Sequence, residues 1–217
     1  MDEQAKETAL KYMANLVEKT PPPTKFAISL PESREVTEGM LLGMYGAQVK
    51  YRDMDFILDD ATVSKVEKVV RWMYDSRKRG LLLCGTLGNG KTTMLRSLKK
   101  LFGFNAEYYE AQSIYNHFKQ SQTFPDISQN AVLLIDDLGV EPPTYNDFGE
   151  IRYPLAEFLM IRYKHNLPTV IATNCTFEQL GERYGDRLQD RMKEMYARIS
   201  YKEPSYRKCV NNANNLL

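Results

Sequence analysis

Apolar positions along this chain fall into blocks that predict helices and short buried strands. Between residues 62 and 75, apolar residues recur every three or four positions, which is the spacing of one helix face. Residues 81–84 (LLLC) form a continuous apolar run that is typical of a buried strand. Helical spacing returns over residues 91–103, where Gly103 is placed to end the helix. The pattern therefore predicts a helix, a strand and a second helix in that order.

The alternation of strand and helix continues through the rest of the chain. Strands are predicted at residues 106–111, 131–135 and 169–173, and helices at 113–119, from Pro154 onward, after the capping sequence 176–179, and at 186–192. Strands that alternate with helices in this way form a parallel sheet with helices on both faces. We therefore predict an α/β fold built on such a sheet.

The N-terminal part of the chain follows a different pattern. Helical spacing over residues 4–18 gives an apolar stripe, and the prolines of TPPPT at residues 20–24 disfavour continuing that helix. The stripe must be buried, either in the groove of a partner or against residues 35–75 of the same chain. We predict that residues 1–60 are a small helical, partner-binding region with a linker, and that residues 61–217 form the α/β domain.

Length and charge narrow the class of protein further. The 217 residues suffice for one full-sized domain with an extension, and the formal net charge of +1 argues against a protein that coats nucleic acid. Residues 65–100 are basic and residues 126–160 acidic, which solvated helix faces would explain. Three widely spaced cysteines indicate neither a disulfide framework nor a zinc site. A charged N-terminus without a long apolar run predicts a cytoplasmic protein with no membrane segment.

The stretch GTLGNGKTT follows the apolar run LLLC and opens the helix predicted after it. It matches the phosphate-binding P-loop, Gly-x-x-x-x-Gly-Lys-Thr, in the structural context that this loop requires. Glycines let backbone N–H groups turn inward around a phosphate, the lysine bridges the β- and γ-phosphates of a nucleotide, and the threonine hydroxyl is a Mg²⁺ ligand. The sequence therefore predicts ATP and Mg²⁺ as ligands, bound by Gly85, Thr86, Leu87, Gly88, Asn89, Gly90, Lys91, Thr92 and Thr93.

Polar residues also follow two other predicted strands. Asp136 comes directly after an apolar run and is predicted to hold Mg²⁺ together with Thr92. The next residue, Asp137, would point the other way and could orient or deprotonate an attacking water, or instead cap the turn at the strand exit. Asn174 follows a later strand, at the carboxyl edge of the sheet where ligands of open α/β folds bind. It is predicted to sense the γ-phosphate.

Two arginines near the C-terminus share one face of a predicted helix. Arg187 and Arg191 lie four positions apart, which places their side chains next to each other. Considered alone, this helix favours pairing within it, such as Arg191 with Glu194 or Arg187 with Asp190.

Four segments together resemble the AAA+ ATPases of the DnaC/IstB group, which are bacterial helicase loaders and transposition helpers. These segments are GTLGNGKTT, LLIDDLGVEP, RYKHNLPTVIATN and RYGDRLQDRMKEM followed by PSYRK, and they extend in order from about residue 80 to residue 208. The resemblance implies a P-loop NTPase fold of the AAA+ type. It also implies that Asn174 is sensor 1, that Arg191 is the arginine finger assisted by Arg187, and that Arg207 replaces sensor 2.

The chain departs from general AAA+ practice in two places. Asp137 stands where many members have glutamate, although the DnaC/IstB group often has aspartate there. Few residues follow Arg207, so the resemblance implies a helical lid that is minimal or absent.

The expected function is that of a DnaC-like replicative helicase loader. Such an ATPase forms an ATP-dependent homo-oligomer, binds a replicative helicase, and hydrolyses ATP slowly and under stimulation by its partner. Tyr115, His117 and Lys119 could contact single-stranded DNA, although core packing with a solvated lysine is the better explanation of this stretch. The alternatives are an IstB-like transposition helper with a transposase partner, a P-loop small-molecule kinase, and a nucleotide-gated adaptor that does not hydrolyse ATP.

Overall fold

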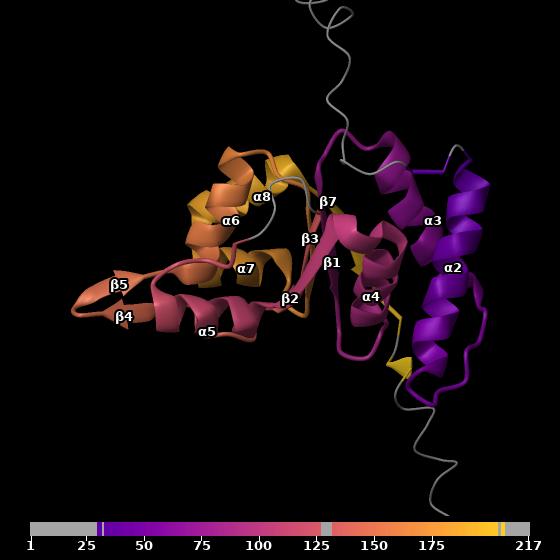
Figure 1. Ribbon diagram of the computed structural model, residues 1–217, viewed down its shortest axis with the longest axis horizontal. Coiled ribbons are helices and arrows are strands. Elements are labelled where there is room, and N and C mark those ends of the chain that lie inside the picture. The colour runs from indigo at the N-terminus through magenta and orange to yellow at the C-terminus, as the bar shows by residue number, and fades with distance from the viewer. Residues whose placement is uncertain (1–29, 32, 127–131, 204, 207–217) are drawn as a thin grey trace, which may run out of the picture.

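A five-stranded parallel sheet forms the centre of the protein in the computed structural model, which describes residues 30–31, 33–126, 132–203 and 205–206. The strand order across the sheet is β2-β3-β6-β1-β7, and each neighbouring pair is parallel (Figure 1). The strands are β1 (Gly80–Gly85), β2 (Ala106–Glu110), β3 (Val132–Leu138), β6 (Thr169–Thr173) and β7 (Tyr196–Tyr201). β1 therefore lies between β6 and β7, although β2 follows it in the sequence.

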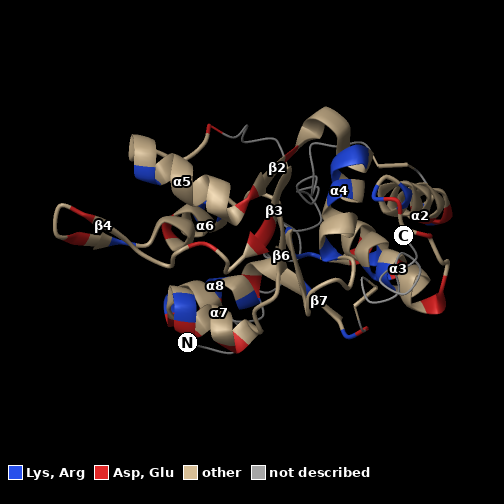
Figure 2. Ribbon diagram, turned by 90° about the horizontal axis from the view of Figure 1, so that it is seen from below, with Lys and Arg blue, Asp and Glu red and all other residues tan. Residues whose placement is uncertain are grey.

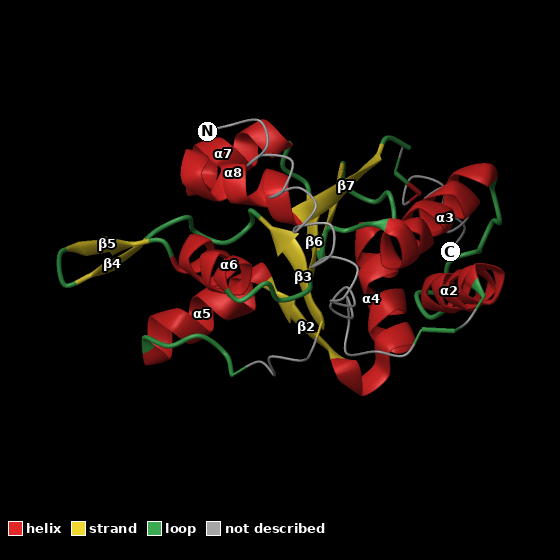
Figure 3. Ribbon diagram, turned by 90° about the horizontal axis from the view of Figure 1, so that it is seen from above, coloured by secondary structure: helices red, strands yellow, loops and turns green. Residues whose placement is uncertain are grey.

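Helices cover both faces of this sheet, as the sequence predicts (Figure 3). One face carries α2 (Arg34–Lys50), α3 (Asp60–Asp75) and α4 (Lys91–Phe102), and the other carries α5 (Ala111–Ser121), α6 (Pro154–Lys164), α7 (Phe177–Tyr184) and α8 (Asp186–Met195). A short 3-10 turn, η1 (Gly103–Asn105), follows α4, and a hairpin of β4 (Tyr145–Asp147) and β5 (Glu150–Arg152) extends from the body on the side of α5 and α6. The predicted α/β fold is confirmed.

Local sequence signals account for most of these elements. Gly103 ends α4, Pro154 occupies the first turn of α6, and the Thr176 side chain caps α7 in the predicted capping box with Gln179. The strand β7 and the β4–β5 hairpin are not predicted by the sequence pattern. Arg198 is exposed in β7, and the hairpin strands are only three residues long.

The helix α2 packs onto the sheet domain, against α3 and α4. Ser33 caps its N-terminus, and Leu41 and Tyr45 enter the same core as the buried residues of α3 and α4. A Cβ on Gly46 would lie 2.9 Å from the Phe56 ring, so this glycine allows the helix to approach the segment that follows it. Residues 34–50 thus share a core with the sheet, whereas the predicted helix 4–18 and the prolines after it lie outside the described residues.

Charged residues are distributed unevenly over this fold. Figure 2 shows Lys and Arg along α3 and α4, and Asp and Glu at the end of β3 and on the β4–β5 hairpin.

None of the helices in the described ranges is long and apolar enough to cross a bilayer.

Candidate functional site

The predicted P-loop connects β1 to α4 and depends on glycine at its end. Gly88 and Gly90 have φ angles of 80° and 96°, which side chains with a Cβ rarely adopt. A Cβ on Gly90 would also collide with the hydroxyl of Tyr45, which reaches the loop from α2. The loop is therefore held between the sheet and α2, with its backbone close to a buried tyrosine.

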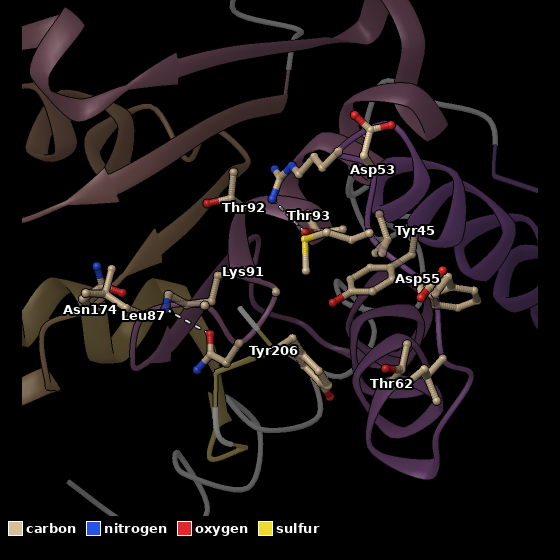
Figure 4. Close-up of a pocket in the computed structure, with 18 of the residues that line it drawn as sticks. Tyr45, Asp53, Asp55, Thr62, Leu87, Lys91, Thr92, Thr93, Asn174 and Tyr206 are labelled. Atoms are coloured by element: carbon tan, nitrogen blue, oxygen red, sulfur yellow. Dashed lines mark hydrogen bonds between the residues drawn. The ribbon is translucent and has the colours of Figure 1, made fainter. Parts of the chain in front are cut away.

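The Lys91 side chain lies inside this loop. Its Nζ donates hydrogen bonds to the carbonyls of Gly85 and Thr86, both at 2.7 Å, and to Oδ1 of Asn89 at 3.1 Å. Figure 4 shows Lys91 among the residues that line the pocket. Only 5% of the residue is exposed. The ammonium group is thus held against the backbone of the loop that would surround a phosphate.

Thr92 and Asp136 meet at the carboxyl edge of the sheet. The Thr92 hydroxyl donates to Oδ1 of Asp136 at 3.2 Å, and the carboxylate also accepts from the Tyr108 hydroxyl at 2.6 Å and the Asp137 N–H at 3.0 Å. Burial and the bond to this carboxylate raise the pKa of Tyr108, so Tyr108 stays a donor at neutral pH. A buried carboxylate beside a hydroxyl, facing a phosphate-binding loop, fits a Mg²⁺ ion that takes its remaining ligands from phosphate and water.

Asp137 and Asn174 lie on the solvent side of the same edge. The pairing of β3 with β6 is irregular between Ile135 and Leu138, and Asp137 has a φ of 54° there. Asp137 is exposed whereas Asp136 is buried, so the two acids lie in different environments. Asp137 and Asn174 both line the pocket that contains Lys91 and Thr92.

The pocket has a volume of about 520 Å³ and extends well beyond the P-loop. The rest of its wall is formed by Tyr45 and Val49 of α2, by the connection 52–57, and by Tyr206 (Figure 4). Sequence reasoning does not identify these residues as part of a site. One signal could have indicated a helix here. Leu41 and Tyr45 lie four positions apart and so share a helix face, although glycines interrupt this stretch.

Arg191, the predicted arginine finger, and Arg187 lie away from this pocket. Arg187 and Arg191 line a second groove, together with Arg77 and the end of α6. Arg191 pairs with Glu194 at 3.3 Å, as the intrahelical alternative predicts, and its guanidinium lies 5.3 Å from the Tyr163 ring centre. Arg207, the residue predicted to replace sensor 2, lies outside the described residues.

The residues suggested for single-stranded DNA are divided between the core and the surface. Tyr115 is buried in α5, and its hydroxyl donates to the Thr144 carbonyl at 3.2 Å. His117 and Lys119 are exposed on the same helix. The core-packing alternative therefore holds for Tyr115, which cannot stack on a base in this arrangement.

A P-loop between β1 and α4, an acidic residue at the end of the neighbouring β3, and the strand order β2-β3-β6-β1-β7 define a P-loop NTPase fold of the AAA+ type. The crystal structure of DnaI is similar, with 23% sequence identity and a TM-score of 0.52 over 74% of this chain and 92% of that one. AMPPCP-bound DnaA from Aquifex aeolicus matches at 15% identity and a TM-score of 0.52, over 75% of this chain and 55% of that one. The replication initiator DnaA bound to AMPPCP and single-stranded DNA matches at 18% identity and a TM-score of 0.51, over 69% and 49%.

Comparison of sequences says less about the class of this protein than comparison of structures. A family model described as RNA helicase matches residues 81–169, which begin at β1 and end at the first residue of β6. No curated protein matches this chain. The structural similarities confirm the AAA+ fold that the resemblance to the DnaC/IstB group implies.

Proposed function

We propose that this protein is an ATP-binding and ATP-hydrolysing member of the DnaC/IstB group that works as a replicative helicase loader in the cytoplasm. The observation that carries the proposal is the pocket at the carboxyl edge of the sheet. In it Lys91 lies inside the P-loop and Thr92 faces the buried Asp136, 3.2 Å away. A lysine within a loop of amides, next to a hydroxyl and a carboxylate, suits a nucleoside triphosphate with its metal ion.

Each side chain of the pocket then has a role in binding or hydrolysis. Lys91 binds the β- and γ-phosphates, and Thr92 and Asp136 hold Mg²⁺, which neutralises charge on the phosphates when bound. Asp137 orients or deprotonates the attacking water, and Asn174 binds the γ-phosphate as sensor 1. The wall of the pocket that includes Tyr45 and Tyr206 takes the base.

The arginines of α8 complete the site of a second copy of this chain in an ATP-dependent homo-oligomer. Arg191 acts as the arginine finger and Arg187 assists it, which agrees with their distance from the pocket of their own chain. Arg207 directly follows Tyr206, a residue of the pocket wall, and would replace sensor 2. We expect hydrolysis to be slow and stimulated by the partner, and Asp137 stands where many AAA+ members have a longer glutamate.

The choice of a helicase loader rests on the segments that resemble the DnaC/IstB group. The similarity to DnaI, and to a DnaA structure that contains single-stranded DNA, supports a role in DNA replication. Residues 1–60 would bind the helicase and residues 61–217 would form the ATPase domain, so that ATP controls the assembly with helicase and DNA. An IstB-like transposition helper would bind a transposase in the same way.

The nucleotide site is tested by Lys91→Ala. We expect the variant to lose binding of a fluorescent ATP analogue and to keep its fold, since the lysine supplies the charge within the loop. Lys119→Ala, which removes an exposed lysine from α5, is the matched control and should bind normally. Unchanged affinity in Lys91→Ala would refute the assignment.

The shared site is tested by mixing two inactive variants. Arg191→Ala should bind ATP without hydrolysing it, and Asp136→Ala should also be inactive. A mixture joins an intact pocket to an intact finger at some interfaces, so part of the ATPase activity should return. If mixed oligomers form and no activity returns at any ratio, Arg191 does not act in trans.

The partner is identified by affinity capture from the native host, with and without a slowly hydrolysed ATP analogue. A replicative helicase that co-purifies in a nucleotide-dependent way supports the loader. A transposase in its place would show that the transposition helper is correct.

A further inference from the structure

A buried lysine of α3 contacts the P-loop and the wall of the nucleotide pocket. Lys65 belongs to α3 and is 2% exposed, although its neighbour Lys68 on the same helix is exposed. An ammonium group loses much of its hydration when it is buried, and proteins retain such a group only where it is paired or hydrogen-bonded. The partners of Lys65 therefore indicate why it is there.

These partners come from the P-loop and from the chain that follows β7. The Nζ of Lys65 donates to the Asn89 carbonyl at 3.3 Å and to the Tyr206 hydroxyl at 3.2 Å. It also forms an ion pair with Glu203 at 3.0 Å, outside hydrogen-bond geometry, and lies 5.0 Å and 4.8 Å from the ring centres of Tyr201 and Tyr206. One ammonium group thus joins three segments that are far apart in the sequence.

Asn89 connects Lys65 to the phosphate-binding lysine. It is completely buried, its Oδ1 accepts from Lys91 at 3.1 Å, and its Nδ2 donates to the Tyr201 carbonyl at 3.1 Å. Lys65 therefore fixes the backbone of a residue whose side chain contacts Lys91. A shift of this residue would change the shape of the loop around the phosphates.

Tyr206 connects Lys65 to the wall of the pocket. Its backbone N–H donates to the Gly88 carbonyl at 3.0 Å, its hydroxyl donates to Asp59 at 3.3 Å, and its side chain lines the pocket. The segment after β7 therefore lies directly against the P-loop. Lys65 is the cation that the hydroxyl of Tyr206 meets there.

We propose that Lys65 is a positioning residue for nucleotide binding, which holds the P-loop through Asn89 and the pocket wall through Tyr206. The proposal rests on the proposed function, because it presumes that the pocket binds a nucleotide. Both hydrogen-bond acceptors of Lys65 belong to one pocket: the Asn89 carbonyl is in its P-loop and the Tyr206 hydroxyl is in its wall. A lysine that only filled space in the core would not require this arrangement. The loss of Lys65 should therefore weaken nucleotide binding as well as stability.

The test compares Lys65→Met, Tyr206→Phe, the double variant and the matched control Lys68→Met. Dissociation constants for a fluorescent ATP analogue are measured by titration, and melting temperatures are measured without nucleotide. Lys65→Met should raise the Kd about tenfold, because the carbonyl and the hydroxyl both lose a charged donor, and Tyr206→Phe should raise it about threefold. Lys68→Met should match the wild type. In the ATPase assay, the KM for ATP should rise more than kcat falls.

The double variant separates positioning from a general loss of stability. If Lys65 acts partly through the Tyr206 hydroxyl, the combined rise in Kd will be smaller than the product of the two single effects. A folded Lys65→Met protein that binds with the wild-type Kd would overturn the proposal. If Lys65→Met does not fold, Lys65→Gln replaces it in the same titration, and a folded Lys65→Gln protein with the wild-type Kd would equally overturn the proposal. Wild-type protein that binds no nucleotide would instead refute the proposed function.

Discussion

The contact between the P-loop and α2 predicts that Gly90→Ala is strongly destabilising. Gly90 has a φ of 96°, and in that region a Cβ costs about 1–2 kcal/mol. The added methyl group also collides with the hydroxyl of Tyr45, which is 3% exposed and packed in the core, and overpacking of this kind costs about 1–3 kcal/mol. We therefore expect the free energy of unfolding to fall by about 3 kcal/mol, which lowers the melting temperature of a domain of this size by about 6–12 °C.

The assay is thermal unfolding without nucleotide, so that any change in ligand binding does not contribute. Tyr45→Phe removes the oxygen that the new methyl group meets and leaves Cζ at 3.2 Å, so Gly90→Ala combined with Tyr45→Phe should regain about half of the loss. Gly43→Ala is the control, since a Cβ on this exposed glycine of α2 would meet no atom within 4 Å, and the variant should gain about 1 kcal/mol. A Gly90→Ala protein that melts within about 2 °C of the wild type would refute the packing argument.

Two further predictions concern stability. Leu41→Ala should lower the free energy of unfolding by about 3 kcal/mol in urea titrations, because Leu41 is completely buried between α2 and the core, whereas Leu58→Ala, at an exposed leucine, should have little effect. Equal effects of the two would show that α2 is not part of the core. Burial raises the pKa of Glu141 above its usual value of 4.5. Between these two pKa values the folded state keeps a proton that the unfolded state has released. The contribution of Glu141 to the free energy of unfolding therefore falls as the pH rises from about 4.5 to the raised pKa. The Glu141→Gln variant should not show this loss of stability. If the free energies of unfolding of the wild type and the variant change with pH in the same way, the prediction is wrong.

The sequence by itself determined the elements that carry the candidate nucleotide site. The motif GTLGNGKTT lies between an apolar run and a helical pattern, and the two aspartates follow another apolar run. These signals are local, because a strand, the turn after it and the start of the next helix are adjacent in the chain. Right-handed connections between parallel strands then bring the ends of β1, β3 and β6 to one edge of the sheet. The positions of Lys91, Asp136 and Asn174 relative to one another could therefore be predicted.

The tertiary structure alone decided what surrounds that site. The glycines of α2 weaken its helical signal, and its place beside the P-loop depends on how Tyr45 and Leu41 pack against α3 and α4. Nothing in the sequence distinguishes Lys65 from the exposed lysine Lys68 on the same predicted helix. The burial of Lys65 follows from contacts with Asn89 and with residues more than 130 positions away in the chain. Such contacts leave no periodic pattern, since they arise where segments meet in the folded protein, and spacing along a chain records only neighbours on the same helix or strand.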